Sequence, residues 1–203
     1  MTTLIAETPA TRGPLDPAAF SAIETLRHGQ QIEIRALRAI DEDGLKAAIA
    51  RISSRSLYRR FFGPKRHFTE KETAHFMNVD FVGHVALVAV VGGRIVGGGR
   101  YIVVRPGLAE LAFAVIDEYQ GQGLGAALLR HLISLARVAG LTQFLADVMP
   151  DNHPMLAVFA KSGLCVSTRR EHGLIALTLD LADAGRGNSS IAPSQKPQRT
   201  IPP

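Results

Sequence analysis

The sequence predicts an α+β domain in which helices cover both faces of a mixed, mostly antiparallel sheet. Residues 84–91 are almost all β-branched or apolar, a Gly-Gly pair follows, and residues 94–104 return as a second strand, which together predict a hairpin. Residues 123–139 carry a leucine stripe at helical spacing and end at Gly140, as an amphipathic helix does. Strand and helix signals alternate along the rest of the chain, which favours this class.

The first half of the domain begins with a strand and continues with helices. Residues 31–37 place isoleucines on one face at the period of a half-buried strand. Asp41 or Asp43 can cap the next helix, in which large apolar residues recur at helical spacing. Thr69 and Glu72 have the spacing of a capping box and predict the start of a short second helix.

The second half alternates more evenly between the two kinds of element. Residues 108–115 follow a Pro-Gly turn and predict a third strand next to the hairpin. After the amphipathic helix, residues 144–149 return as a strand, and residues 152–162 predict a short helix that a glycine ends. The last two strands are expected around residues 164–169 and 174–179.

Length and composition predict one globular domain with two less regular ends. The chain has 203 residues, 46% of them hydrophobic and 20% charged, which is enough for one core. We expect an N-terminal arm over residues 1–30, the domain over residues 31–181, and a disordered tail over residues 182–203, which is rich in Ser, Pro and Gln. The longest apolar run, residues 85–91, is far shorter than the ~20 residues of a membrane helix. The N-terminus does not resemble a secretory signal, so we expect a cytoplasmic protein with no membrane partner.

Cysteine and histidine usage gives no sign of a disulfide or a metal. Cys165 is the only cysteine, so no internal disulfide is possible, and we expect it to be a small core residue. The histidines are scattered, and none pairs with cysteine or carboxylates at metal-ligand spacing. No metal site is predicted.

The chain has a modest formal charge of +5, and its basic residues form no continuous block. We therefore predict no nucleic-acid partner. The densest cluster includes Arg51, Arg55 and Arg59, whose spacing would put them on one helix face, followed closely by Arg60. A solvated face explains this pattern. The alternative is a surface that attracts an acidic protein substrate or the 3′-phosphate of a coenzyme.

The most informative stretch runs from a strand through a glycine loop into the amphipathic helix. Gly121, Gly123 and Gly125 remove side chains where the chain enters this helix, so that backbone N–H groups can converge on an anion. A pyrophosphate is a suitable guest. Glycines that merely make a tight turn are the alternative, but three of them at alternate positions before such a helix favour the anion.

The same residues also satisfy a dinucleotide fingerprint. Residues 121–126 read as G-x-G-x-x-A, and Asp147 lies at the distance expected for a ribose ligand. In that fold, however, the glycines follow the first strand almost at once, whereas residues 116–120 intervene here, and a hairpin precedes the loop. We therefore favour an acyl-coenzyme A over NAD(P) or a flavin.

The loop resembles the signature of GNAT acetyltransferases, Gln/Arg-x-x-Gly-x-Gly/Ala, and an Ala-Phe-Ala-Val strand precedes it as in that family. The resemblance extends over residues 31–181 and implies the GNAT fold, with acetyl-CoA as co-substrate. It implies that backbone groups of Phe113, Ala114 and Val115 hold the pantetheine arm as an extra strand. The signature itself, with the amides that would hold the pyrophosphate, comprises Gln120, Gly121, Gln122, Gly123, Leu124, Gly125 and Ala126. Asn152 matches the family's asparagine that contacts the coenzyme, although a plain helix cap would also explain it.

The chemistry of acetyl transfer requires a base, because a lysine ammonium titrates near ~10.4 and only the free amine attacks a thioester. Glu110 matches the position of the family's general-base glutamate, and we expect it in a half-buried groove, where it acts directly or through a water. The resemblance also places the oxyanion near backbone N–H groups around Val115, where the family's strand bulges. An outward-facing strand carboxylate is the alternative for Glu110.

One position departs from the family pattern. Many GNAT enzymes protonate the leaving thiolate with a tyrosine, but this chain has Phe159 there, and a phenyl ring donates no proton. Tyr119 and Tyr101 are conceivable substitutes. Otherwise the thiolate leaves unassisted or through water, which a thiol pKa near ~8.5 allows.

A finer resemblance concerns the acceptor. The stretch over residues 53–72 and the N-x-P-M sequence at Asn152 are similar to the acetyltransferase domain of bacterial Pat-type protein-lysine acetyltransferases. This implies a primary amine as acceptor, with a protein lysine preferred. A small-molecule amine and a non-catalytic acyl-CoA sensor stay as alternatives, and the oligomeric state is left open.

Overall fold

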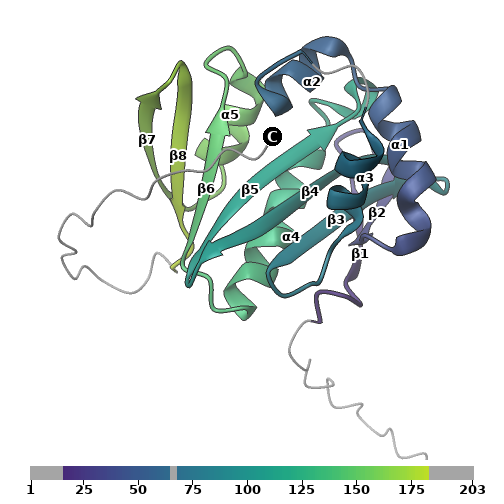
Figure 1. The fold of residues 1–203 in the computed structure, drawn as a ribbon, viewed down its shortest axis with the longest axis horizontal. Helices are drawn as coiled ribbons and strands as arrows, with labels where there is room; N and C mark the ends of the chain where they lie inside the picture. Colours follow the sequence, from purple (N-terminus) through teal and green to yellow (C-terminus); the bar gives the residue numbers. More distant parts are fainter. Residues whose placement is uncertain (1–15, 65–67, 183–203) are drawn as a thin grey trace, which may run out of the picture.

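A single sheet of eight strands forms the framework of the computed structural model, which describes residues 16–64 and 68–182 (Figure 1). The order across the sheet is β1-β2-β3-β4-β5-β6-β8-β7, and every neighbouring pair is antiparallel except β5 and β6. The strands are β1 (Ser21–Thr25), β2 (Gln31–Ala36), β3 (His84–Val91), β4 (Arg94–Arg105), β5 (Leu108–Val115), β6 (Gln143–Val148), β7 (Cys165–Glu171) and β8 (Leu174–Asp180). The mixed, mostly antiparallel sheet that the sequence predicts is confirmed.

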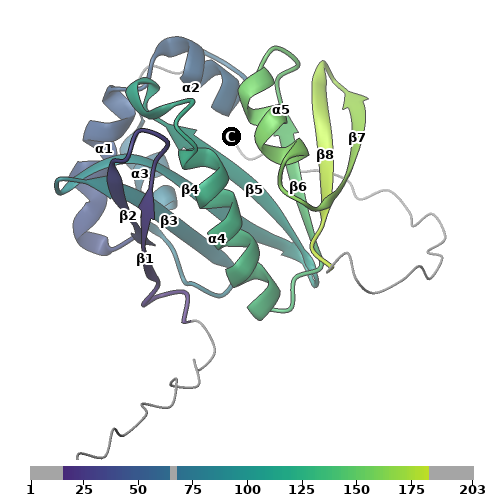
Figure 2. The same cartoon turned by 180° about the vertical axis from the view of Figure 1, so that it is seen from behind.

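Helices lie on both faces of this sheet, as expected. The opposite views in Figures 1 and 2 show α1, α2 and α3 over one face and α4 and α5 over the other. Their bounds are α1 (Glu42–Ala50), α2 (Ser54–Phe61), α3 (Glu70–Met77), α4 (Leu124–Val138) and α5 (His153–Ala160), with short 3-10 turns η1 (Ala39–Asp41) and η2 (Asp117–Tyr119).

A run of three glycines in β4 lets α4 approach the sheet closely. A Cβ atom at Gly99 would lie 2.7 Å from the ring of Phe113 and 3.0 Å from Leu132 of α4, which is fully buried. Side chains alternate along a strand, so Gly99 and Tyr101 face α4. Arg100 points to the opposite face, where it contacts the backbone of α3. The face covered by α4 and the opposite face, which carries Arg100, therefore contribute different residues to the site.

The first strand was not expected. Residues 21–25, which the sequence analysis assigns to the arm, form β1 and pair with β2. Phe20 and Leu26 on either side are buried in the core. Glu24 lies 2.7 Å from Arg130 and 2.6 Å from His131, which ties β1 to α4. Residues 1–15 of the arm and residues 183–203 of the tail lie outside the described residues, so the division into arm, domain and tail stays a prediction.

Two further expectations about single residues are corrected. Cys165 is exposed at the start of β7, at an edge of the sheet, because no helix covers that end. Arg51 follows the last residue of α1 and therefore does not share a helix face with Arg55 and Arg59, which belong to α2.

The predicted helix starts have mixed outcomes. Thr69 and Glu72 form the expected capping box at the start of α3. Asp41 occupies the N-cap position of α1, but its carboxylate gives the helix no hydrogen bond. It pairs instead with buried Arg35 at 2.6 and 2.8 Å and accepts a hydrogen bond from the N–H of Arg38.

Candidate functional site

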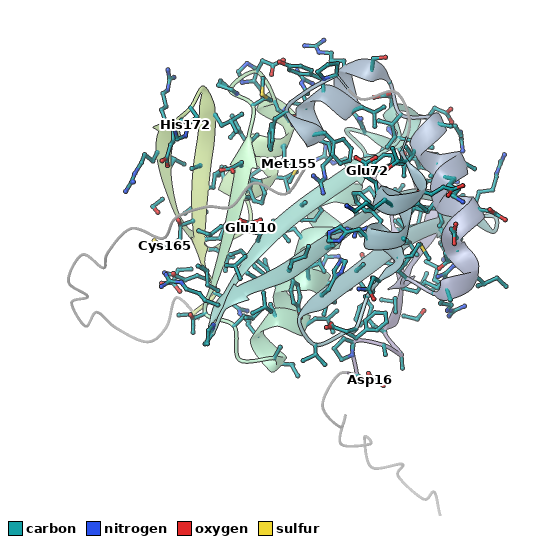
Figure 3. All side chains as sticks on the ribbon, viewed as in Figure 1. Asp16, Glu72, Glu110, Met155, Cys165 and His172 are labelled. Atoms are coloured by element: carbon teal, nitrogen blue, oxygen red, sulfur yellow. The ribbon has the colours of Figure 1, made fainter. Side chains whose placement is uncertain are left out.

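β5 and β6 are the one parallel pair of strands in the described sheet, and the ladder between them is the shortest in that sheet. β5 and β6 pair only from Leu108 to Glu110 on one strand and from Gln143 to Leu145 on the other. Beyond these residues the strands separate, and a cavity of about 620 Å³ lies between them. Its walls come from β4, β5, β6, α2, α5 and the loop before α4. Figure 3 shows Glu110 near the point of separation and Met155 of α5 farther along.

The cavity brings together almost all of the residues that the sequence singles out. Of the twelve, the one that does not line it is Gln122, whose side chain donates a 2.6 Å hydrogen bond to the backbone oxygen of Glu118 instead. The others are Glu110, Phe113, Ala114, Val115, Gln120, Gly121, Gly123, Leu124, Gly125, Ala126 and Asn152.

The glycine loop has the conformation of an anion cradle. Gly121 and Gly123 have φ values of 72° and 98°, in the region that favours glycine, immediately before α4 begins at Leu124. Within the part of the chain that the structure describes, the amides of residues 121–126 donate no hydrogen bond to a backbone carbonyl. They are therefore available to an anion, which the positive end of the α4 dipole also attracts.

Arg27, in the turn between β1 and β2, holds this loop and also lines the cavity. Its N–H donates to the carbonyl of Gln122 at 3.1 Å, and its Nη1 donates to the carbonyl of Gly121 at 3.2 Å. Both carbonyls of the loop thus accept hydrogen bonds from one residue, which restrains the conformation of the loop. Sequence analysis missed Arg27 because it lay in the supposed arm, and only the pairing of β1 brings it to the loop.

Gln120 acts as a brace between three segments. Its Nε2 lies 2.9 Å from the carbonyl oxygen of Val115, 2.9 Å from Oδ1 of Asp117 and 3.1 Å from the hydroxyl of Ser56 in α2. Burial works to raise the pKa of Asp117, but hydrogen bonds from Ser56 and from Ser53 outweigh it and hold that pKa below its usual value. The side chain of Gln120 thus fixes the end of β5 against α2.

Asn152 has the capping role that the sequence left open. Its side-chain oxygen accepts a hydrogen bond of 3.4 Å from the N–H of Met155, and Pro154 lies in the first turn of α5. The second role, contact with a coenzyme, stays a prediction. The strand bulge differs from expectation: β5 pairs regularly with β4 from Ala109 to Val115. The register shifts lie in β4, next to Val96 on its β3 side and between Val103 and Arg105 on its β5 side.

Glu110 is exposed, whereas we expected it to lie in a half-buried groove. It pairs with Ile102 across the β4–β5 ladder and therefore shares the α1–α3 face with Arg100. The cavity thus has its glycine loop at the start of α4, on one side of the sheet, and Glu110 on the other.

Three aromatic residues near the site bear on the absence of a catalytic tyrosine. Phe159 is 1% exposed, and its ring centroid lies 6.2 Å from that of Phe113. Tyr101 faces α4, and its hydroxyl is buried without a hydrogen-bond partner in the described structure, so burial raises its pKa to about 12. It lies on the opposite face from Glu110 and does not replace the missing tyrosine. Tyr119 does line the cavity.

The basic cluster splits into paired and unpaired members. Arg51 lies 3.0 Å from Glu118, and Arg59 lies 2.8 Å from Asp151. Arg60 lines the cavity together with Arg100, and neither forms an ion pair within the described residues.

No helix in residues 16–64 and 68–182 is both long and apolar enough to cross a bilayer. The same residues contain no group of three or more His, Cys, Asp or Glu side chains placed to hold a metal ion.

Known proteins resemble this chain over most of the domain. Residues 45–164, more than half of the chain, match the Acetyltransferase (GNAT) family. "Acetyltransferase PA5475" from Pseudomonas aeruginosa is 35% identical over 149 residues, which are 68% of this chain and 80% of that protein. "Acetyltransferase Pat" from Mycolicibacterium smegmatis is 30% identical over 162 residues, 77% of this chain but 47% of Pat, so this chain spans about half the length of that relative.

A solved structure agrees with the sequence relatives. The GNAT domain of PAT from S. lividans has a TM-score of 0.74 and 33% sequence identity, and the match covers 79% of this chain and 96% of that domain. The dinucleotide alternative is not supported, because the loop follows an antiparallel meander and not the first strand of a parallel sheet. With its separated β5 and β6, its glycine loop and these relatives, the chain belongs to the GNAT family of acetyltransferases.

Proposed function

We propose that this acetyltransferase moves the acetyl group of acetyl-CoA to a primary amine, preferably that of a protein lysine, with Glu110 as the general base. One observation carries the proposal: the cavity between β5 and β6 joins the glycine loop at the start of α4 to Glu110 on the other face of the sheet. A coenzyme whose pyrophosphate sits on the loop can lay its pantetheine arm along the unpaired part of β5. Its thioester would then reach the side that carries Glu110.

The roles of the cavity residues follow from this placement. Backbone groups of Phe113, Ala114 and Val115 hold the pantetheine arm, and the amides of residues 121–126 hold the pyrophosphate. Two of the signature side chains work indirectly, since Gln120 braces Val115 and Gln122 bonds to Glu118. Asn152 caps α5 and borders the same cavity.

The reaction then needs few side chains. Glu110, directly or through a water, takes a proton from the acceptor ammonium, and the free amine attacks the thioester carbonyl. Backbone N–H groups near Val115 stabilise the tetrahedral oxyanion. As the C–S bond breaks, the electron pair leaves with sulfur. The attacking nitrogen gives its second proton to water, and the thiolate takes a proton from water because Phe159 has none to give. The exposed position of Glu110 makes exchange of its proton with solvent simple.

The preference for a protein lysine rests on the relatives. The sequence resembles Pat-type protein-lysine acetyltransferases, and two of the similar proteins, from Mycolicibacterium smegmatis and S. lividans, carry the name Pat. A small-molecule amine fits the same chemistry. If the protein were a non-catalytic acyl-CoA sensor, Glu110 would be dispensable, because no amine would need to lose a proton.

Substitution of the base tests the proposal. The Glu110→Gln variant should bind acetyl-CoA as the wild type does, measured as a rise in melting temperature, and should lose most of its turnover at neutral pH. Glu171→Gln, on the exposed edge strand β7, is the matched control and should behave as the wild type. Full turnover in Glu110→Gln would refute the base assignment. Intact-mass analysis of acyl-CoA synthetases and of small amines incubated with acetyl-CoA then identifies the acceptor class.

A further inference from the structure

We propose that the guanidinium groups of Arg60 and Arg100 form a subsite for a carboxylate of the acceptor, so that the preferred acceptor holds an amine and a carboxylate close together. This inference rests on the proposed function, because it describes the acceptor end of the same cavity. The subsite lies at a part of the cavity wall that is formed neither by the glycine loop nor by Glu110.

Arg100 is held in place by uncharged groups. Its Nη1 donates a 3.2 Å hydrogen bond to the backbone oxygen of Phe76, and its Cζ lies 4.1 Å from the centroid of the Phe76 ring. The same Nη1 lies 3.1 Å from Nε2 of His84, whose Nδ1 lies 2.9 Å from the backbone oxygen of Asn78. With Nδ1 donating its proton to that oxygen, Nε2 accepts from Arg100. The guanidinium is therefore oriented, while its Nε and Nη2 have no hydrogen-bond partner among the described residues.

Arg60 brings a second positive charge to the same wall from α2. Its Cζ lies 4.8 Å from the ring centroid of Phe61, and in residues 16–64 and 68–182 no carboxylate lies within ion-pair distance of it or of Arg100. The neighbouring Arg59, by contrast, has Asp151 as a partner. Arg59 lines the same cavity, so among the neighbours Arg59 and Arg60 of α2 only Arg59 is neutralised by a carboxylate within the described residues.

Two neighbouring cations in a partly buried position are unfavourable without an anion. Burial lowers the pKa of Arg60 to about 10, and burial together with the charge of Arg60 lowers the pKa of Arg100 to about 9. Both side chains are charged at neutral pH. A bound carboxylate would satisfy the free guanidinium donors and remove the repulsion, which makes such a site strongly selective for anions.

The position of the pair assigns this anion to the acceptor. Arg100 pairs with Ala112, and Glu110 lies two residues away on the same face, a diagonal separation of roughly 7–8 Å. The glycine loop precedes α4, which covers the opposite face. A carboxylate on Arg100 would hold an amine two or three bonds away within reach of Glu110. A free amino acid offers this arrangement within its own bonds. A lysine beside Asp or Glu in a protein is separated from that carboxylate by many bonds, and it offers the same arrangement only when its long side chain folds back toward the carboxylate.

Matched acceptor pairs test the subsite and separate these two sources. Free amino acids are compared with their carboxamides, and lysine peptides with an adjacent Asp are compared with peptides that carry Asn there. The carboxylate member of at least one pair should have a kcat/KM about 10- to 100-fold higher, as expected for charged hydrogen bonds. Equal rates within both pairs would overturn the subsite without affecting the assignment of Glu110.

Variants connect any preference to the arginines. Arg60→Gln should reduce the preference for the acid to about twofold or less and leave the acetyl-CoA thermal shift unchanged, whereas Arg60→Lys should keep part of it. Arg94→Gln, exposed at the start of β4, is the control. Arg100→Gln should act as Arg60→Gln does, although the loss of its contacts with Phe76 also affects stability. A preference for the acid that survives in both glutamine variants would refute the proposal. So would a wild type that shows no preference between the members of the acceptor pairs and instead has a higher turnover with succinyl-CoA than with acetyl-CoA.

A binding measurement covers the case in which no acceptor is acetylated, which would count against the proposed function. With coenzyme A present, N-acetylglycine should raise the melting temperature of the wild type but not of Arg60→Gln, and N-acetylglycinamide should have no effect. Equal shifts with both compounds would show that the arginines bind no carboxylate.

Discussion

Arg59 of α2 and Asp151, just before α5, join two sides of the cavity: Nη2 of Arg59 lies 2.8 Å from Oδ2 of Asp151 and 2.8 Å from its backbone oxygen. The hydrogen bond from Arg59 holds the pKa of Asp151 below its usual value. The contact is at the surface, since the carboxylate of Asp151 is 56% exposed, so we expect it to influence access more than stability.

Asp151→Asn should therefore raise KM for acetyl-CoA by about two- to fivefold, with a melting temperature close to that of the wild type. Added salt screens exposed pairs, so high salt should raise KM in the wild type and have little further effect in the variant. Lys46→Gln, which removes an exposed pair on α1, is the control. Identical salt dependence in wild type and variant would mean that the contact does not control access.

The buried pair of Arg35 and Asp41 should respond to acid. Burial works to raise the pKa of Asp41, but hydrogen bonds from Arg35 and Arg38 outweigh it and lower that pKa in the folded state. A carboxyl group with a lowered folded pKa stabilises the fold above its unfolded pKa, near ~3.9, and loses this contribution as the pH falls through the folded value.

Asp41→Asn should accordingly lower the free energy of unfolding at pH 7 by about 3 kcal/mol, because it leaves Arg35 as a buried cation. Urea unfolding at several pH values measures this, and the difference between variant and wild type should shrink in the acid range. Asp43→Asn, on the exposed surface of the same helix, should change little. A difference that is constant down to pH 3 would argue against the pair as its source.

Removal of the brace at Gln120 should damage coenzyme binding more than folding. Gln120→Ala frees the carbonyl of Val115, and we expect a loss of about tenfold in kcat/KM for acetyl-CoA, the effect of a distorted strand end. Gln120→Glu should be worse, because it places a second carboxylate beside Asp117. If the alanine variant has the kcat/KM of the wild type, the hydrogen bonds of Gln120 have no part in the site.

Two glycines of the loop should differ in their tolerance of a methyl group. Gly123 has a φ of 98°, so Gly123→Ala should cost about 1–3 kcal/mol of stability and weaken acetyl-CoA binding. Gly125 lies inside α4, and a Cβ there would have an ordinary contact of 3.7 Å with Val158, so Gly125→Ala should be tolerated in both measurements. Equal effects of the two changes, by thermal unfolding and coenzyme titration, would contradict this distinction.

Local patterns were sufficient to predict most of the elements. The hairpin of β3 and β4 and the leucine stripe of α4 depend on residues that are close in sequence, and the structure confirms both within one or two residues. The glycine loop was also found this way, because its conformation depends on glycine itself.

Contacts between distant segments could not be predicted in this way. β1 alternates too weakly to be recognised alone, so Arg27 was missed with it. The pairing of Gln120 with Ser56 joins residues 64 apart, and no local pattern indicates it. Cys165 was placed in the core by its residue type, although exposure at a sheet edge depends on whether another element covers it. The exposure of Glu110 likewise depends on how far β5 and β6 separate.

The short pairing of β5 with β6 has a consequence for the ligand-free protein. Beyond Glu110 the two strands no longer pair with each other, and strand edges without a partner strand attract any extended chain that can reach them. A pantetheine arm would cover those of β5, so an occupied cavity should suppress self-association. Protein kept with coenzyme A should therefore aggregate more slowly than protein stripped of it.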